Sequence, residues 1–182
     1  ARSAGQMMRE TIWSIKNEQI TTEDLFLKTS EYCEKIKIGL SQEINIAFSN
    51  QSVQLTPSQA LSAFRIIQES IQNAIKHAAC SEVNIGIHPN RITIKDNGKG
   101  FSLEENSHGN GIANMQERAG ENDMTLTIAS NAIGTEITLF FNQRNVDVGQ
   151  QPKSHTVFRF VGFFCSLIAF HVSCLEFNQH RM

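Results

Sequence analysis

The chain has 182 residues and a formal net charge of −2, with acidic and basic side chains interspersed along it. This length accommodates one packed domain of roughly 120 residues with extra segments, rather than two full domains. The charge excludes a strongly basic surface, so nucleic acid is not an expected partner. The cysteines, which lack Cys-x-x-Cys spacing and so favour free thiols in a reducing compartment, are Cys33, Cys80, Cys165 and Cys174.

The first predicted element is a helix within residues 1–20. Met8, Thr11 and Ile12 fall on one helical face, which predicts the buried side. No capping residue precedes this pattern, and Ala1 stands directly inside it. The pattern therefore favours a helix that was cut from a longer one.

A second helix is expected to begin at Thr21 or Thr22. Glu23 and Asp24 support this start, because carboxylates stabilise the positive end of the helix dipole. Its predicted inner stripe consists of Leu25, Thr29, Cys33, Ile36 and Leu40. Alternating apolar residues over 44–48 then predict a half-buried strand.

The best-defined element is a helix that starts at residues 56–59. Its start combines an N-cap threonine, a proline at the first helical position and a glutamine that can close a capping box. One continuous apolar face is predicted from Phe64, Ile67, Ile71, Ala74, Ile75 and Ala78. The opposite face carries Glu69, Asn73, Lys76 and His77. A solvated face is the plain interpretation, but asparagine is a mediocre helix former and needs a reason in mid-helix.

Two strands are expected over 83–87 and 91–95. Asp96 lies on the same side of the second strand as its apolar residues, so its carboxylate should reach the rim of the core. A carboxylate there is costly unless something hydrogen-bonds it. Gly98 and Gly100 free the backbone just beyond, so that an object can approach closely. For the aspartate–asparagine–glycine segment alone, a simple turn is the favoured interpretation.

A further glycine segment, Gly109-Asn110-Gly111, leads into a helix whose inward residues begin with Ile112. The free N–H groups and the dipole at such a start suit a phosphate, although an ordinary flexible helix start is the simpler alternative. Strands are expected over 125–129 and 135–141. The alternating strands and one-sided helices predict an α/β two-layer sandwich, a mixed sheet of about five strands with three helices on one face.

Residues 143–182 differ in composition from the rest. A polar stretch over 143–154 precedes a largely apolar run over 157–175. The run is long enough for a membrane span, although His171 inside it counts against one. Three origins stay open: an extraneous or frame-shifted tail, an accessory apolar helix, and a genuine span.

Together, these segments resemble the catalytic, ATP-binding domain of bacterial sensor histidine kinases, in the superfamily that includes DNA gyrase, Hsp90 and MutL. The matching segments are residues 8–15 (end of the dimerisation hairpin), 65–78 (N box), 96–101 (G1 box), 109–119 (second glycine box) and Gly134-Thr135 (before the last strand). The short connection from Phe101 to Gly109 is similar to the short ATP lid of nitrate- and desaturase-type sensors. The resemblance implies a Bergerat-type ATP-binding fold.

The resemblance also implies a domain order and partners. Residues 1–20 would end a dimerisation hairpin, residues 21–142 would form the catalytic domain, and residues 143–182 would be a linker and apolar tail. The domain would present the γ-phosphate of ATP to a histidine of a dimerisation domain, and no histidine here has the expected Glu-x-His-Asp-like setting. The implied partners are that phosphoacceptor domain and a response regulator. The full-length protein would be a homodimer, with this domain on the cytoplasmic side of a membrane-anchored sensor.

The resemblance assigns roles to individual residues as well. Asp96 would accept a hydrogen bond from the adenine amine, with Gly98 and Gly100 leaving room for the base. Asn73 would bind Mg²⁺ through its carbonyl oxygen, and Glu69 would orient the nucleophile or accept its proton. The implied ATP-binding set is Asn73, Lys76, His77, Asp96, Gly98, Gly100, Gly109, Gly111, Ile112 and Thr135.

Other functions within the superfamily stay open. A stand-alone anti-sigma-factor serine kinase is disfavoured, because it needs no hairpin remnant such as the helix around Trp13. A regulatory module that binds nucleotide without transfer is disfavoured by the retained Glu69 and Asn73. A gyrase- or MutL-like motor is least favoured, because no transducer domain is recognisable after residue 142.

Overall fold

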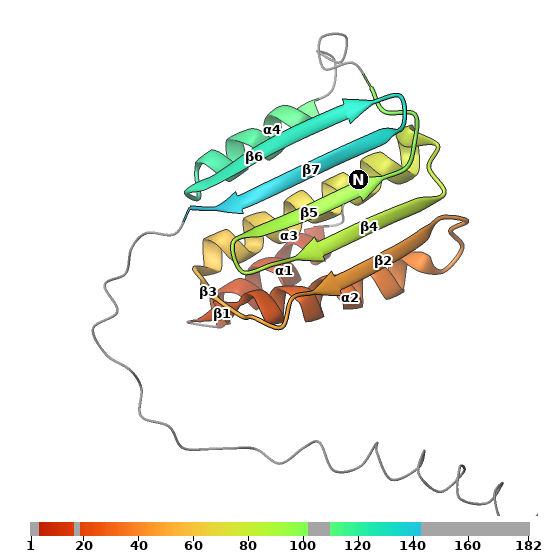
Figure 1. Ribbon diagram of the computed structural model, residues 1–182. Helices are drawn as coiled ribbons and strands as arrows, with labels where there is room; N and C mark the ends of the chain where they lie inside the picture. Colours follow the sequence, from red (N-terminus) through yellow and green to blue (C-terminus); the bar gives the residue numbers. More distant parts are fainter. Residues whose placement is uncertain (1–3, 17–18, 102–109, 143–182) are drawn as a thin grey trace, which may run out of the picture. The chain divides into compact units, whose positions relative to one another are not determined.

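The computed structural model describes residues 4–16, 19–101 and 110–142 (Figure 1). In chain order its elements are α1 (Ala4–Lys16), β1 (Ile20–Thr21), α2 (Thr22–Lys37), β2 (Glu43–Phe48), β3 (Gln54–Leu55), α3 (Pro57–Asn73), the π-helix η1 (Ala74–Ala78), β4 (Glu82–Ile87), β5 (Arg91–Asp96), α4 (Asn110–Gly120), β6 (Met124–Asn131) and β7 (Gly134–Phe141). All of them belong to one compact unit, residues 1–144. Among the helices in the described ranges, none has the length and apolarity to cross a membrane.

A mixed five-stranded sheet forms one layer of this unit, in the order β2-β4-β5-β7-β6. Strand β2 runs parallel to β4, and the other neighbours are antiparallel. The helices α2, α3 and α4 lie over one face of the sheet (Figure 1). The predicted two-layer α/β sandwich is therefore confirmed. Its largest fully buried side chains include Leu25, Ile44, Phe64, Ile67, Ile71, Ile87, Ile92, Met115 and Leu139.

The starts of α2 and α3 follow from local hydrogen bonds. Thr21 caps α2 and forms a capping box with Asp24. Thr56 caps α3, where its hydroxyl accepts from the Gln59 backbone N–H and the Gln59 side chain accepts from the Thr56 N–H. Both starts were predicted. The two-residue antiparallel ribbon β1–β3 was not, because so short a pair leaves no periodic pattern.

Helix α1 buries a different face from the one predicted. Met8 and Ile12 are 65% and 44% exposed, whereas Glu10 is 3% exposed. Gln68 on α3 donates from Nε2 to Glu10 Oε1 at 3.0 Å, and Arg65 Nε lies 3.9 Å from the other carboxylate oxygen. The predicted apolar stripe was wrong because α1 packs on α3 through this buried polar group.

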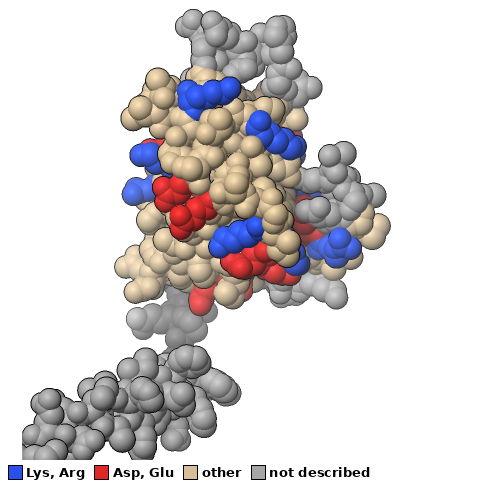
Figure 2. Space-filling model, turned by 90° about the vertical axis from the view of Figure 1, so that its right-hand side faces the viewer, with Lys and Arg blue, Asp and Glu red and all other residues tan. Residues whose placement is uncertain are grey.

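The surface of the unit carries mixed charge. The side of the molecule shown in Figure 2 displays Lys and Arg side chains intermingled with Asp and Glu. Several of the opposite charges pair along α2, for example Lys35 with Glu31 and Lys37 with Glu34. On this face, charges of both signs are therefore interspersed.

Candidate functional site

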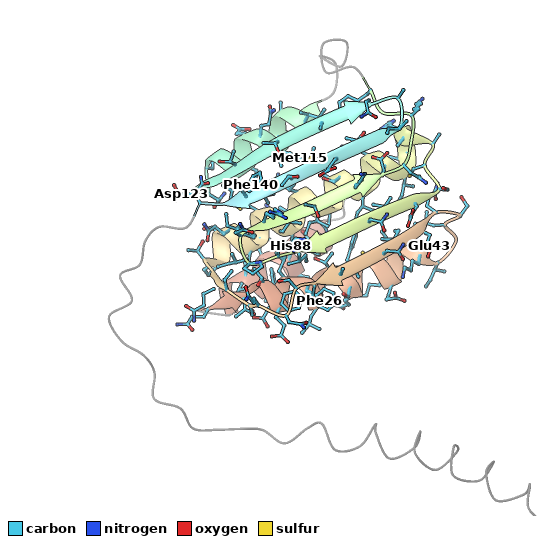
Figure 3. The ribbon with its side chains drawn as sticks, in the orientation of Figure 1. Phe26, Glu43, His88, Met115, Asp123 and Phe140 are labelled. Carbon is cyan, nitrogen blue, oxygen red and sulfur yellow. The ribbon has the colours of Figure 1, made fainter. Side chains whose placement is uncertain are left out.

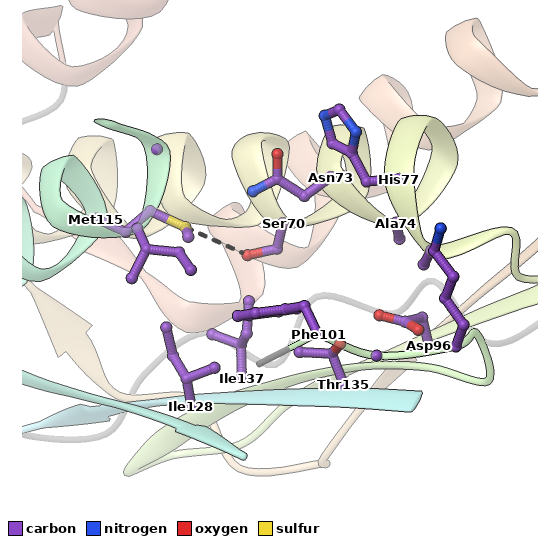
Figure 4. Close-up of a pocket in the computed structure, with 15 residues that line it drawn as sticks. Ser70, Asn73, Ala74, His77, Asp96, Phe101, Met115, Ile128, Thr135 and Ile137 are labelled. Atoms are coloured by element: carbon purple, nitrogen blue, oxygen red, sulfur yellow. Dashed lines mark hydrogen bonds between the residues drawn. The ribbon is translucent and has the colours of Figure 1, made fainter. Parts of the chain in front are cut away.

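A cavity of about 530 Å³ opens between α3, α4 and the end of the sheet where β5 finishes and β7 begins (Figure 4). It contains most of the residues that the sequence assigned to an ATP site. Those that line it are Asn73, His77, Asp96, Gly100, Gly111, Ile112 and Thr135. Gly109 lies outside the described residues, as does the connection over 102–108. Segments far apart in the sequence therefore meet at one concave surface.

Asp96 and Thr135 form the sheet end of this cavity. The two residues pair in register across β5 and β7, and each is 7% exposed. The backbone N–H of Gly98 donates to Asp96 Oδ1 at 2.9 Å, which offsets part of the cost of burying the carboxylate. A carboxylate has several acceptor positions, so this bond leaves capacity for a ligand. Figure 4 shows both side chains beneath α3 at the cavity wall.

The Asp96 carboxylate also affects a buried thiol next to the cavity. Burial raises the pKa of the Cys80 thiol, and the negative charge of Asp96 raises that pKa further. Cys80 is 6% exposed, and its Sγ donates to the carbonyl oxygen of Ala74 at 3.5 Å. Cys80 therefore stays a neutral, structural residue beneath the end of the α3–η1 segment.

Glu69 lies beside two residues of the cavity wall, Asn73 and Gly111. Glu69 and Asn73 are one turn apart on α3. A Cβ on Gly111 would lie 3.1 Å from Glu69 Oε1 and 3.8 Å from Asn73 Nδ2, so the first turn of α4 passes close to both side chains. A carboxylate, an amide and the start of a helix thus occur together, as the sequence predicted.

The pitch change after Asn73 separates Lys76 from His77. Residues 74–78 form a π-helix, and Ala79 ends it with φ 50°. Wider π-turns rotate the following side chains relative to an ideal α-helix. His77 lines the cavity, whereas Lys76 is exposed and is not part of the lining. The predicted role of Lys76 toward phosphate stays a prediction.

Gly98 and Gly100 each lie where two backbone segments approach closely. A Cβ on Gly98 would overlap the carbonyl oxygen of Ala78, and Gly98 is absent from the cavity lining among the described residues. Gly100 has φ +61°, and a Cβ there would overlap the carbonyl oxygen of Asn131. Both glycines therefore let the protein's own backbone segments approach each other. Gly100 also lines the cavity, and the expectation that these glycines leave room for a base stays a prediction.

Several lining residues were not assigned from the sequence. Lys99 and Phe101 lie within the predicted G1 segment, and Figure 4 shows the Phe101 ring inside the cavity. Ser70 lies between Gln68 and Asn73 on α3, and its hydroxyl contacts the Met115 sulfur at 3.7 Å. The position of Lys99 and Phe101 within the predicted G1 segment could have indicated that they line the cavity. For Ser70 and Met115, the only indication in the sequence was their helical spacing. The apolar part of the wall is completed by Ala74, Ala78, Met115, Ile128 and Ile137.

The chain matches a known protein family over the segments that line the cavity. A model of the histidine kinase-, DNA gyrase B- and HSP90-like ATPases matches residues 58–161, more than half of the chain. The chain belongs to this family. The match includes the segments that line the cavity. It confirms the resemblance to this ATPase superfamily that was inferred from the sequence.

Curated relatives of this chain within the family are named as histidine kinases. It is 32% identical over 120 residues to the signal transduction histidine-protein kinase/phosphatase DegS of Bacillus subtilis, covering 61% of this chain and 30% of DegS. It is 33% identical over 85 residues to the sensor histidine kinase LiaS of the same organism, covering 44% of this chain and 24% of LiaS. The chain therefore spans less than a third of the length of these relatives.

Solved structures agree with the fold. The cytoplasmic segment of histidine kinase QseC has a TM-score of 0.55 at 14% identity, covering 78% of this chain and 93% of that structure. The ATP-binding domain of PrrB from Mycobacterium tuberculosis has a TM-score of 0.54 at 18% identity, covering 69% of this chain and 97% of that structure. At these identities the likeness is one of fold.

Proposed function

We propose that this chain is the ATP-binding catalytic domain of a two-component sensor histidine kinase. In this proposal it binds Mg·ATP and presents the γ-phosphate to a histidine on a dimerisation domain. One observation carries the proposal: a single cavity is lined by Asp96 and Thr135 at one end and by Asn73 and Gly111 at the other, with Glu69 beside Gly111. The two ends have the chemistry of a base site and a phosphate site.

The sheet end suits adenine. Asp96 can accept a hydrogen bond from the exocyclic amine, and the Thr135 hydroxyl can donate to the neighbouring ring nitrogen. Apolar side chains such as Ile128 and Ile137 line the wall and favour a flat aromatic ligand. The bond from the Gly98 N–H to Asp96 holds the carboxylate in place before a ligand binds.

The helix end suits a triphosphate. The start of α4 supplies backbone N–H groups and a positive dipole end, and His77 and Lys99 add side-chain donors to the wall. The described residues contain no cluster of three or more acidic, histidine or cysteine side chains for a metal. A magnesium ion that takes most of its ligands from phosphates and water needs few protein ligands, so the Asn73 carbonyl fits as a single one. When bound, Mg²⁺ neutralises charge on the phosphate oxygens.

Glu69 would act on the nucleophile. It lies one turn before Asn73, so its carboxylate can orient an incoming imidazole or accept its proton. The names of DegS and LiaS as histidine kinases support a histidine as the group that is phosphorylated. Because the chain spans a small part of these relatives, the phosphoacceptor domain, the response regulator, the homodimer and the cytoplasmic position in a membrane-anchored sensor are all parts of the proposal.

Phosphoryl transfer in trans tests the proposal. The purified chain is incubated with γ-labelled ATP, alone and with the dimerisation hairpin of its full-length protein. We expect label on the hairpin and negligible label on the chain itself. Glu69→Gln should keep ATP binding but reduce transfer by about a hundredfold or more, because general base catalysis contributes factors of this size. Strong self-labelling on a histidine of this chain would contradict the proposal.

A further inference from the structure

Three polar side chains form a row across the cavity end of the sheet. Asp96 on β5 pairs in register with Thr135 on β7, and Thr135 pairs in register with Ser130 on β6. Residues opposite each other on neighbouring strands project to the same face. Asp96 and Thr135 line the cavity, whereas Ser130 lies behind them and is not part of the lining. Any effect of Ser130 on a ligand must therefore pass through another residue.

The Ser130 hydroxyl joins two segments of the site. Its oxygen accepts a hydrogen bond from the Phe101 backbone N–H at 2.8 Å and lies 3.2 Å from Thr135 Oγ1. The close approach of Gly100 to the Asn131 carbonyl holds the backbone in register here. Phe101 projects its ring into the cavity, so Ser130 contacts the backbone of one wall residue and the hydroxyl of another (Figure 4).

The bond between the Ser130 and Thr135 hydroxyls can form with either oxygen as the donor. A serine hydroxyl has one hydrogen and two lone pairs, and the Phe101 N–H occupies one lone pair. The second lone pair could accept from Thr135, or the Ser130 hydrogen could be donated to Thr135 Oγ1, 3.2 Å away. When Ser130 donates, Thr135 accepts, and the Thr135 hydrogen is left for a ligand in the cavity that Thr135 lines.

We propose that Ser130 is a positioning residue that fixes the Thr135 hydroxyl as a hydrogen-bond donor toward the ligand. This inference rests on the proposed function and specifies how the base site distinguishes adenine from other bases. Asp96 then offers an acceptor beside a fixed donor on Thr135. Adenine presents the complement, an amine donor beside a ring-nitrogen acceptor, whereas hypoxanthine presents a carbonyl beside an N–H. Without Ser130, the Thr135 hydroxyl can rotate and accept instead, so discrimination between the two bases should fall.

Binding of ATP and ITP tests this role. The dissociation constants of both nucleotides are measured by calorimetry for the wild-type chain, Ser130→Ala and Ser130→Thr. The ratio of the ITP to the ATP constant should fall about threefold to tenfold in Ser130→Ala, the size expected for one hydrogen bond. Ser130→Thr keeps the donor and should restore the ratio. Thr127→Ala is the matched control, because Thr127 lies on the same strand with its side chain on the other face.

A double-mutant cycle separates positioning from general destabilisation. If Ser130 acts through Thr135, Ser130→Ala should change the ratio little in a Thr135→Val background. Should Ser130→Ala fail to fold, Ser130→Cys carries the same test, because a thiol is a weak donor of similar size. If Ser130→Ala weakens ATP and ITP binding equally, or leaves the ratio of their dissociation constants unchanged, the proposed role of Ser130 is overturned and the proposed function is not. A wild-type chain that binds no ATP overturns the proposed function and this inference with it.

Discussion

Replacing Asp96 by asparagine removes a charge from the cavity and keeps the shape of the side chain. The asparagine carbonyl can still accept from the Gly98 N–H, which is 2.9 Å from the carboxylate in the wild-type chain, so the fold should hold. Its NH₂ group then faces the position where the adenine amine donates. The change therefore loses a charge-assisted hydrogen bond, worth about 1.5–3 kcal/mol, and places two donors opposite each other. The dissociation constant for ATP should rise about tenfold to a hundredfold.

Isothermal titration with ATP and with adenosine measures this effect. Both ligands should weaken by similar factors, because the lost contact is to the base, and magnesium should make no difference to the loss. Asp123→Asn is the matched control: Asp123 is exposed just before β6, at the far end of the sheet (Figure 3), and asparagine tolerates its φ of 53°. Wild-type ATP affinity in Asp96→Asn, with an unchanged melting temperature, would refute the base-site assignment.

Two further predictions concern stability and thiol chemistry. Gly98→Ala should lower the free energy of unfolding by about 1–3 kcal/mol in a denaturant titration, because the new Cβ would overlap the Ala78 carbonyl. Gly120 has open space around it, so Gly120→Ala should be neutral or slightly stabilising in the same titration. Equal stability of the two variants would contradict this packing. Burial raises the pKa of Cys33 to about 11, so about one thiol in a thousand is ionised at pH 8. Mass spectrometry should therefore find Cys33 unmodified after maleimide treatment of the native chain and modified after unfolding. Rapid labelling of Cys33 in the native chain would count against its burial.

The sequence predicts this fold well where local chemistry and burial agree. The threonine caps, the apolar faces of α2 and α3 and the alternation in β5 each follow from short patterns that packing reinforces. The position of Asp96 at the end of a buried face followed from the period of a strand. These features also located both ends of the cavity, because the residues concerned sit at element ends.

What the sequence did not reveal depends on contacts between distant segments. Helix α1 buries the face that carries Glu10, whose carboxylate accepts a hydrogen bond from Gln68, and not the apolar face that was predicted. The hydrophobic periodicity of a sequence does not indicate that a carboxylate is buried. The π-helix after Asn73 placed His77, but not Lys76, in the cavity lining, whereas a uniform helix places both on one side. The need for Gly98 comes from the Ala78 carbonyl, twenty residues away in the chain. Such contacts appear only once the elements are packed.

In the proposed function Asn73 would hold the magnesium ion of Mg·ATP, and Asn73→Ala tests this role. Asn73 is half-buried on the cavity wall, so the change should leave the fold intact. Titrations of ATP and adenosine, each with and without Mg²⁺, are compared in the wild-type chain and the variant. We expect the variant to lose the magnesium dependence of ATP binding and to bind adenosine almost as the wild type does. A folded Asn73→Ala variant whose ATP binding still responds to magnesium as the wild type does would contradict it.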